Sequence, residues 1–492
     1  MADESVTLYA WINGKRVDAD EYMERENPAD PQKIVAYVPK TTTEQAAEAI
    51  EAARAAFPAW KEVPVEERIE RMERAIQTMK DRTPELAETL AEEHGKPIYD
   101  AEGEMAVSIM WMEYACQTVK ETIADQVDEG EGGKTIIRQE PIGVVSAISP
   151  WNYPIALSTI KIAPAILTGN TVVSKPSPFA PHAVSLVVEM IAKEFPDGVL
   201  NLVHGEAEVG VELTSNAHVD KIAFTGGTET AKKIMKSAAD TIKDMTLELG
   251  GNDAAVVLPD FDVNDERAMR RMVISNFLTA GQICMIAKRI YVPRTLYNEF
   301  VEKYQEAANK WVKIGSPFDE QVTTGPLNNK QQLDFVKSLV DNAAEKGADV
   351  IPLGHIVDKE LFEQGYFLQP TLVLGADQQD DIVKEEQFGP TVPIVPYDTV
   401  DEAVKMANDS IYGLTSSVWG EEDHAIEVAA RLEAGSTMVN TAAVQGLDVR
   451  YPFGGVKQSG IGREYGKEGL LGYVAPHVIN VPKTRDLPYI PE

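Results

Sequence analysis

Strand-like and helix-like segments alternate between residues 142 and 250, and this alternation limits the folds open to the chain. Short apolar runs rich in β-branched residues are predicted to be strands, and the longer periodic runs between them are predicted to be helices. The expected strands are 144–148, 171–174, 200–203 and 221–224, and the expected helices are 155–167, 183–195 and 228–240. Such βαβ units predict a parallel sheet with helices on both faces.

A second α/β pattern follows over residues 252–450, as expected for a chain of 492 residues, which is too long for one hydrophobic core. Its predicted strands are 254–258, 289–293 and 391–395, and its predicted helices are 295–313 and 330–346. Dinucleotides bind at the carboxyl ends of parallel strands. The G-x-G-x-x-G fingerprint of a standard Rossmann site is missing, so the motif alone does not predict such a site.

The first 120 residues are predicted to be largely helical. Thr41 and Glu44 have the spacing of a capping box before an Ala-rich run. One buried helix face is predicted from apolar residues that recur at steps of three and four: Ile69, Met72, Ile76 and Met79. An acidic, Gly-rich stretch at 129–133 and a strand-like segment at 134–138 predict a surface hairpin.

Two distant segments combine into one possible reaction. Cys284 lies in a Gly-containing turn, Gly281-Gln282-Ile283-Cys284, where a thiolate can approach a substrate. Glu248 ends an apolar run and can activate water to hydrolyse an acyl intermediate on the sulfur. The alternatives are an inert buried cysteine and a structural carboxylate at a strand end. Cys116, the other cysteine, lies in a helical stretch and is predicted to be a packing residue.

Several motifs along almost the whole chain match one family. With the Cys284 and Glu248 segments, they are Ser149-Pro150-Trp151-Asn152-Tyr153-Pro154, Lys175-Pro176-Ser177-Pro178, Phe224-Thr225-Gly226-Gly227-Thr228, Glu386-Gln387-Phe388-Gly389-Pro390, Pro452-Phe453-Gly454-Gly455 and Ser459-Gly460-Ile461-Gly462-Arg463-Glu464. In this order and spacing they resemble the NAD(P)-dependent aldehyde dehydrogenase superfamily. The resemblance implies oxidation of an aldehyde to a carboxylate through a thiohemiacetal and a thioester on Cys284, with Glu248 activating the water that hydrolyses the thioester.

The same resemblance implies an α/β fold of the aldehyde dehydrogenase type, with three parts. Residues 1–120 and 140–250 would form a Rossmann-type dinucleotide-binding domain, and residues 251–451 a catalytic α/β domain. Residues 121–139 and 472–492 would form a small β arm for oligomerisation, in a homodimer or homotetramer.

Asn152 would donate a hydrogen bond to the alkoxide that forms when Cys284 attacks, together with the backbone N–H of Cys284. Its alternative role is a helix N-cap before Pro154, and the two roles are compatible. A CoA-dependent or reductive relative is the alternative enzyme class, and Glu248 argues against it because such relatives lack this glutamate. A non-catalytic protein on the same scaffold would be expected to lose Cys284, Asn152 or Glu248.

The cofactor implied by the resemblance is NAD or NADP. Glu386 would hold the nicotinamide ribose, Phe388 would pack by the nicotinamide ring, and Trp151 and Lys175 would line the adenosine ribose. The other expected cofactor-binding residues are Ser149, Ser177, Pro178, Gly205, Gly210, Phe224, Gly226, Gly227 and Leu249. Pro178 stands where NAD-preferring members carry a glutamate, which favours some use of NADP, and Gly227 replaces a common serine.

Arg450 precedes the Pro452 motif, in a region that lines the substrate entrance in relatives. A guanidinium there would suit the carboxylate of a semialdehyde. The alternative is a salt bridge with Asp448 or another acid, and the sequence leaves both open.

The formal net charge is −32, from 78 acidic and 46 basic residues, which excludes nucleic acid and anionic membranes as expected partners. So acidic a chain is either an acidic cytosolic protein or, the interpretation we favour, a protein of halophilic origin, where salt screens the repulsion between its charges. The seven histidines lack the spacing of metal ligands, so no metal site is expected. Without a signal peptide or an apolar run of membrane-spanning length, the chain is predicted to be cytoplasmic.

Overall fold

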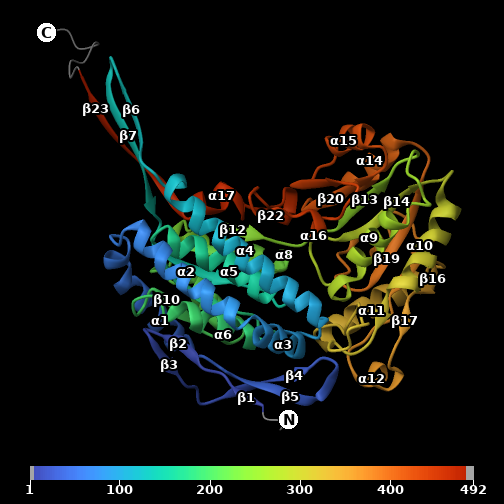
Figure 1. Ribbon diagram of the computed structural model, residues 1–492, viewed down its shortest axis with the longest axis horizontal. Helices are drawn as coiled ribbons and strands as arrows, with labels where there is room; N and C mark the ends of the chain where they lie inside the picture. The colour runs from blue at the N-terminus through green and yellow to red at the C-terminus, as the bar shows by residue number, and fades with distance from the viewer. Residues whose placement is uncertain (1–4, 484–492) are drawn as a thin grey trace.

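The computed structural model describes residues 5–483. Two α/β units lie side by side, and a narrow β arm projects away from the first unit (Figure 1). The first unit contains most of the chain up to Glu248, and the second contains most of the chain from Asp253 to Val439. The mixed α/β fold with parallel sheets is therefore confirmed.

The first unit is built on an 8-stranded sheet whose central strands run parallel. Its order is β22 (Gly460–Ile461), β12 (Asp244–Glu248), β11 (Lys221–Thr225), β8 (Val144–Ile148), β9 (Thr171–Lys175), β10 (Leu200–Leu202), β2 (Ala10–Ile12) and β3 (Lys15–Val17). The predicted strands from 144 to 224 are thus present. The short strand β22 comes from a late segment that the expected division of the chain left unassigned, and it pairs antiparallel with β12 beside Glu248.

Helices cover both faces of this sheet. One face carries α2 (Val65–Asp81), α3 (Thr83–His94), α4 (Ile98–Thr122), α5 (Pro154–Leu167) and α6 (His182–Ala192). The other face carries α1 (Thr43–Trp60), α7 (Ala207–Ser215) and α8 (Thr228–Ala238), followed by η1 (Ala239–Thr241). The predicted helices 155–167, 183–195 and 228–240 correspond to α5, α6 and α8. The short helix α7 was not predicted.

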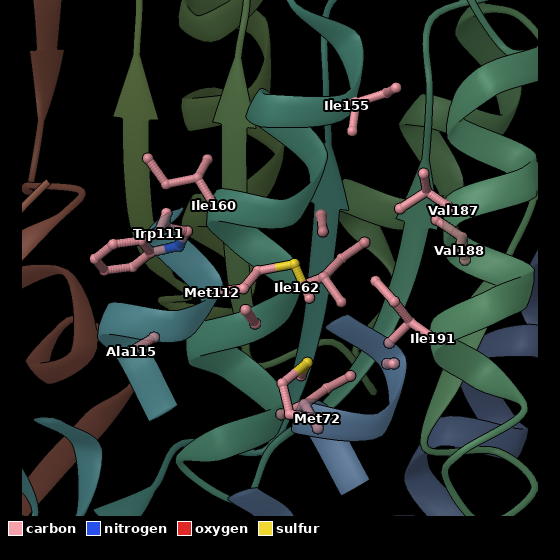
Figure 2. Close-up of a cluster of buried hydrophobic side chains, with 14 of the residues drawn as sticks. Met72, Trp111, Met112, Ala115, Ile155, Ile160, Ile162, Val187, Val188 and Ile191 are labelled. Carbon is pink, nitrogen blue, oxygen red and sulfur yellow. The ribbon is translucent and has the colours of Figure 1, made fainter. Parts of the chain in front are cut away.

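The largest apolar core lies between the first group of helices and the sheet. In Figure 2, side chains of α4 and α5 such as Trp111, Met112 and Ile162 face Met72 of α2 and Ile191 of α6. The predicted α2 face is confirmed, because Met72, Ile76 and Met79 are buried and Ile69 packs against the same core. This core holds α4 and α5 in place, and both helices position residues of the site described below.

The second unit has a 7-stranded sheet that is parallel except at one edge. Its order is β16 (Asp349–Pro352), β18 (Thr371–Leu374), β19 (Thr391–Tyr397), β14 (Ala287–Pro293), β13 (Asp253–Val257), β20 (Thr415–Trp419) and β21 (Ser436–Val439). One face packs on α9 (Glu266–Phe277) and α10 (Tyr297–Trp311), and the other on α11 (Lys330–Glu345), α13 (Asp381–Lys384), α14 (Val400–Asn408) and α15 (Glu422–Ala429).

The N-terminal region differs from the prediction. Before α1 the chain forms strands instead of helices. These are β2 and β3, and a 3-stranded sheet of β1 (Val6–Thr7), β5 (Asp30–Pro39) and β4 (Tyr22–Asn27). Asn13 and Gly14 connect β2 to β3 with φ values of 50° and 75°. Asn-Gly favours a two-residue hairpin turn with positive φ at both positions, so a signal for this hairpin was present in the sequence.

The capping box of α1 is also shifted by one residue from the prediction. Thr42 is the N-cap, and it exchanges hydrogen bonds with Gln45. The Thr41 hydroxyl instead accepts a hydrogen bond from the backbone N–H of His204. Thr41 therefore ties the start of α1 to the loop after β10.

The arm is a 3-stranded antiparallel sheet of β23 (Val474–Pro482), β7 (Gly133–Pro141) and β6 (Gln126–Gly130). The predicted hairpin is present, and the chain near its C-terminus adds the third strand. Residues 484–492 of the predicted arm lie outside the described residues. The remaining elements are η2 (Leu278–Gly281), β15 (Lys313–Ile314), β17 (His355–Ile356), α12 (Lys359–Gln364), α16 (Ala443–Gly446), η3 (Lys457–Ser459) and α17 (Gly466–Leu471).

Candidate active site

Many of the expected site residues lie at one edge of the first sheet, because the parallel strands that carry them end there. Ser149 follows β8, Lys175 ends β9, and Glu248 ends β12. Phe224 is the next-to-last residue of β11, and Gly205 lies in the loop after β10. This carboxyl edge is where open α/β sheets bind ligands.

A pocket of about 260 Å³ opens where this edge meets the second unit. The first unit contributes the turn of Asn152 and the start of α8, and the second unit contributes Cys284 and the start of α11. The lining residues are Pro150, Trp151, Asn152, Thr225, Gly226, Gly227, Leu249, Gly250, Cys284, Gln332, Phe335, Glu386 and Phe388. The structure thus brings Cys284 and Asn152 together with six of the expected cofactor residues.

The loop that carries Cys284 has an unusual backbone. Thr279, Ala280 and Gly281 have φ values of 49°, 52° and 73°, in the left-handed region that β-branched threonine rarely adopts. A Cβ on Gly281 would lie 2.2 Å from the carbonyl oxygen of Gly389, so only glycine fits there. After the loop, the buried Lys288 donates hydrogen bonds to the carbonyl oxygens of Ile283 and Cys284 at 2.7 and 2.8 Å. The nucleophile loop is therefore fixed at both ends.

The Cys284 thiol is partly buried between the two units. Burial raises the pKa of the thiol to about 12, and the nearby Lys288 charge opposes this rise only in part. The resting group is therefore a neutral thiol at physiological pH, and attack on a carbonyl requires a proton acceptor close by. Glu248 is among the carboxylates whose charge acts on the thiol.

Asn152 is buried, and its side-chain N–H group donates to the carbonyl oxygen of Gln282 at 3.0 Å. It does not cap the following helix, because Tyr153 is the N-cap residue of α5 and no cap side chain bonds to that helix start. The N-cap alternative is therefore wrong. The amide retains a second N–H, and it lines the same pocket as the Cys284 thiol.

Glu248 is a buried carboxyl group with no hydrogen-bond partner for either oxygen among residues 5–483. Burial raises its pKa well above the ordinary value, and the adjacent Glu464 raises it further. Lys161, which binds Glu464 at 2.7 Å and the Thr225 hydroxyl at 2.6 Å, opposes this rise. A buried unpartnered carboxyl group is costly, which is typical of functional rather than structural positions.

Glu386 and Phe388 extend the pocket from the second unit. One Glu386 oxygen accepts the backbone N–H of Gly251 at 3.0 Å, and Lys288 lies 3.9 Å from it. Phe388 adopts a positive φ of 50° and packs edge-on against Trp151, with 5.4 Å between the ring centroids. Gln332 of α11 stabilises this segment by donating to the carbonyl oxygens of Gln387 and Phe388.

The expected cofactor glycines differ in the space around them. Gly227 is the N-cap residue of α8, no cap side chain bonds to this helix start, and a Cβ on Gly227 would meet nothing within 4 Å. A helix start with N–H groups facing open space attracts phosphate. Gly226 and Gly205 have no such space, because a Cβ would lie 2.5 Å from the Phe224 ring and 2.8 Å from Val209. Gly210 lies inside α7 with open space around it.

Lys175 is buried at the end of β9, and burial lowers its pKa to about 8. The negative charges of Glu206 and Glu208, at the start of α7, act in the opposite direction. Ser177 accepts a hydrogen bond from the backbone N–H of Phe179, which shapes the turn that contains Pro178. The Ser149 hydroxyl is bonded to that of Ser158 at 2.7 Å.

Arg450 lies in a separate cavity of about 570 Å³ between α4 and the segment 445–450. Its side chain is 66% exposed, and its guanidinium forms a two-pronged ion pair with Asp448, at 2.5 to 3.0 Å. Hydrogen bonds and charge from Arg450 lower the pKa of Asp448 to about 2. The structure therefore contains the Asp448 ion pair, which was the alternative to an anion site.

Within residues 5–483, no group of three or more His, Cys, Asp or Glu side chains could hold a metal ion. In the same part of the chain, no helix is both long and apolar enough to cross a membrane. The site itself contains a thiol, an amide donor, an unpartnered carboxyl group and a helix start that begins with glycine.

Comparison with known proteins agrees with this set of chemical groups. The model of the aldehyde dehydrogenase family matches residues 14–479. The chain belongs to the aldehyde dehydrogenase family. It is 36% identical to the glutarate-semialdehyde dehydrogenase of Pseudomonas putida, over 94% of this chain and 96% of that protein. The succinate-semialdehyde dehydrogenase [NADP(+)] of Escherichia coli shows the same identity and the same coverage of both chains.

Solved structures show the same relationship. The betaine aldehyde dehydrogenase of Staphylococcus aureus, solved in complex with NAD+, superimposes with a TM-score of 0.92 at 31% identity. The match covers 99% of this chain and 97% of that chain. This aldehyde dehydrogenase therefore oxidises an aldehyde to a carboxylate with NAD or NADP, and the acyl-transferring alternative is not favoured.

Four side chains of the enzyme's site were not assigned a role from the sequence. Lys288 is four residues after Cys284, and Gln332 is the third residue of α11, with no motif to mark either. Lys161 lies in a helix that is apolar on nearly every side, where a buried lysine signals a partner. Glu464 belongs to a recognised motif, but only the fold shows that it reaches Lys161.

Proposed function

We propose that Cys284 is the nucleophile of this aldehyde dehydrogenase, that Asn152 stabilises the oxyanion, and that Glu248 is the base for hydrolysis. The observation that carries the proposal is the shared pocket of Cys284 and Asn152, close to the unpartnered carboxyl group of Glu248. We also propose that Glu386, Phe388, Gly226 and the other expected cofactor residues hold the dinucleotide.

The residues would act in sequence. The Cys284 thiol loses its proton to water in the pocket, and the sulfur attacks the aldehyde carbon. The alkoxide that forms accepts hydrogen bonds from the Asn152 amide and the backbone N–H of Cys284. NAD(P)+ bound in the pocket supplies the hydride acceptor. Glu248 then removes a proton from the water that attacks the thioester on Cys284, and the carboxylate product leaves.

Two substitutions test these roles. Cys284→Ser should abolish turnover while leaving cofactor binding and the melting temperature nearly unchanged, whereas Cys116→Ser, in the apolar core, should retain turnover. Glu248→Gln should give a burst of about one NAD(P)H per active site and then slow turnover, because hydrolysis is blocked more than hydride transfer. Normal steady-state turnover of either active-site variant would remove that residue from its role.

Two substrate classes are compatible with the site. The names of two relatives favour a semialdehyde, whose carboxylate Arg450 would bind after leaving Asp448. The Arg450–Asp448 ion pair favours an uncharged aldehyde, because it neutralises the guanidinium beside the entrance. Phe453 and Tyr465 belong to the largest apolar core, and Cys284 and Leu447 pack against the same core.

A comparison of succinic semialdehyde with butanal separates the two classes. If Arg450 binds the carboxylate, Arg450→Ala should lower kcat/KM for the semialdehyde at least about tenfold more than for butanal, a discrimination of about 1.4 kcal/mol. Equal effects on both aldehydes would exclude Arg450 as an anion site. Asp448→Asn is the matched variant: it frees the guanidinium and should favour the semialdehyde only if Arg450 faces the substrate.

We further propose a domain organisation, an oligomeric state, a cellular location and a source for the enzyme. Residues 1–120 and 140–250 would form the dinucleotide-binding domain, residues 251–451 the catalytic domain, and residues 121–139 and 472–492 an arm for a homodimer or homotetramer. The free cysteines of the described chain and the need for a reduced Cys284 favour the cytoplasm. The net charge of −32 favours a halophilic source.

A further inference from the structure

Cys284 and Asn152 lie on different units of the fold, so their relative position must be fixed by contacts between these units. The direct contact is the Asn152 amide bond to the Gln282 carbonyl oxygen. A second set of contacts starts from the first two turns of α4 and from Lys96, two residues before this helix. These contacts reach the segments that carry Cys284 and Asn152, and no step of the proposed reaction uses them.

The Asn152 turn is held on both sides by one buried ion pair. Lys96 and Glu104 are fully buried and lie 2.6 Å apart. Lys96 donates to the backbone oxygen of Asn152 at 2.9 Å and lies 3.7 Å from the centre of the Tyr153 ring. The other Glu104 oxygen accepts the backbone N–H groups of Ile155 and Ala156 at 2.7 and 3.1 Å.

Glu104 therefore caps α5 from a neighbouring helix. The N-cap residue of α5, Tyr153, makes no such bond itself. A buried carboxylate at a helix N-terminus is stabilised by the helix dipole and by the two N–H donors. The backbone immediately after Asn152 thus has little freedom to move.

Asp100 reaches the nucleophile loop from the same helix, one turn before Glu104. Its carboxylate is buried and accepts hydrogen bonds from the Thr279 hydroxyl and, at 2.8 Å, from the Tyr153 hydroxyl. The Tyr153 and Thr279 hydroxyls are themselves 3.2 Å apart. Thr279 is the first of the left-handed residues that lead to Cys284, where a β-branched residue is strained and needs an external constraint.

We propose that Asp100, Glu104 and Lys96 form a clamp that sets the distance between the oxyanion donor Asn152 and the nucleophile Cys284. Lys96 and Glu104 fix the Asn152 turn, and Asp100 fixes the loop of Cys284 through Thr279. Because the three residues share one helix start, the two catalytic segments cannot shift independently. The clamp rests on the proposed roles of Cys284 and Asn152, and its members are positioning residues.

Thr279→Val is the test variant, because it keeps the shape of the side chain and removes only the hydroxyl group that donates a hydrogen bond to Asp100. Substitutions of Lys96 or Glu104 are less suitable, because each would leave a buried charge unpaired and destabilise the fold. Thr279→Ser keeps the hydroxyl. Thr122→Val, at the other end of α4, removes a hydroxyl that bonds only within its own helix.

Single-turnover kinetics with enzyme in excess of aldehyde measure the steps up to hydride transfer, independently of hydrolysis. Because small misplacement of reacting groups costs up to about 100-fold in rate, Thr279→Val should lower this rate roughly 10- to 100-fold. Thr279→Ser and Thr122→Val should stay within about threefold of the wild type. The Kd for the cofactor should change little in any of these variants.

Alkylation of Cys284 by iodoacetamide separates positioning from loss of structure, because this reaction forms no oxyanion. The clamp predicts that Thr279→Val alkylates at nearly the wild-type rate while its single-turnover rate falls. An unchanged single-turnover rate in Thr279→Val, or an equal fall in Thr279→Ser, would overturn the clamp. So would a fall that is matched by the alkylation rate.

The variant Asn152→Ala shows whether the clamp alone is wrong or whether the proposed oxyanion role of Asn152 is wrong as well. If Asn152→Ala lowers the single-turnover rate and Thr279→Val does not, only the clamp fails. If Asn152→Ala itself leaves that rate unchanged, the oxyanion role fails, and the clamp fails with it.

Discussion

At the scale of single residues, the protonation state of Glu248 controls the proposed chemistry. Burial and the neighbouring Glu464 raise its pKa well above that of an ordinary carboxyl group. A general base works only in its deprotonated form. The raised pKa therefore makes the hydrolytic step sensitive to acid at a pH where an exposed glutamate would be fully ionised.

We expect kcat to rise as the pH increases through the raised pKa of Glu248 and to fall, with a slope approaching about tenfold per pH unit, below it. Measurement of kcat from about pH 5.5 to about pH 9.5 tests this dependence. In Glu248→Gln the residual rate should lose the acidic limb, because glutamine does not titrate. An acidic limb of the same position and slope in both proteins would assign the titration to another group.

Cofactor choice also depends on a few residues around the adenosine ribose. Pro178 cannot accept hydrogen bonds from the ribose hydroxyls or repel a 2′-phosphate, as a glutamate would. Lys175 remains as a cation and Ser177 as a donor for a phosphate. The structure adds Glu206 and Glu208, whose negative charges act on Lys175 and oppose a phosphate there.

We therefore predict measurable activity with NADP+, and a shift of the kcat/KM ratio toward NAD+ in Pro178→Glu. Glu206→Gln should shift the ratio toward NADP+, because it removes a negative charge near Lys175. The measurement is kcat/KM for both cofactors with one aldehyde. A wild-type preference for NAD+ above about a thousandfold, roughly 4 kcal/mol, would show that another feature excludes the phosphate.

At the scale of elements, the sequence predicted what local patterns determine. The strands from β8 to β11 and the helices α5, α6 and α8 were predicted because apolar periodicity marks buried elements. The N-terminal strands were missed, although Asn13-Gly14 signals a hairpin. Strands β1 to β3 have only two or three residues and carry almost no periodic pattern, whereas β4 and β5 are longer and were missed without that reason.

The candidate site, too, was predictable from the sequence only in part. Cys284, Glu248 and Asn152 are in recognisable motifs, so their candidacy follows from the sequence. Their environment does not, because it depends on contacts between residues far apart in the chain. Lys161 meets Glu464, 303 positions later, and Thr279 meets Asp100, 179 positions earlier.

The β arm is the element whose surface most clearly lacks a partner in the single chain. Val127, Val478 and Val481 are 52 to 57% exposed, and Ile479 is 37% exposed. The arm projects from the body of the molecule (Figure 1), and its strands pair mainly with one another. Exposed apolar side chains gathered on a projecting sheet indicate an interface with another subunit.

We expect a dimer or tetramer in solution, and we expect Val478→Asp to shift it toward smaller species, because a charge would be buried in the interface. Ile426→Asp is the matched control, since Ile426 of α15 is 52% exposed and far from the arm. Sedimentation under active conditions measures the mass. A monomeric wild type, or the same mass distribution for Val478→Asp and the wild type, would contradict the assigned role of the arm.

At the scale of the whole molecule, the net charge of −32 dominates. Ion pairs such as Arg294–Asp398 and Lys330–Asp334 lie at the surface, but the acidic residues outnumber the basic ones by 78 to 46. At least 32 of the acidic residues, the difference between 78 and 46, therefore have no basic residue of their own to pair with. Repulsion among surface charges acts over about 10 Å at 0.1 M salt and over about 3 Å at 1 M.

We predict that the melting temperature and the activity both fall as the salt concentration decreases from about 2 M to about 0.05 M, because the self-repulsion destabilises only the compact state. The loss should occur with KCl and NaCl alike, since screening depends on ionic strength rather than on a bound ion. Sucrose at matched osmolality is the control and should not replace the salt, because it carries no charge. Replacing several unpaired surface glutamates by glutamine should lower the salt concentration at which half the activity remains, without changing Cys284 or its surroundings. Full activity and an unchanged melting temperature across this range would disprove the halophilic origin.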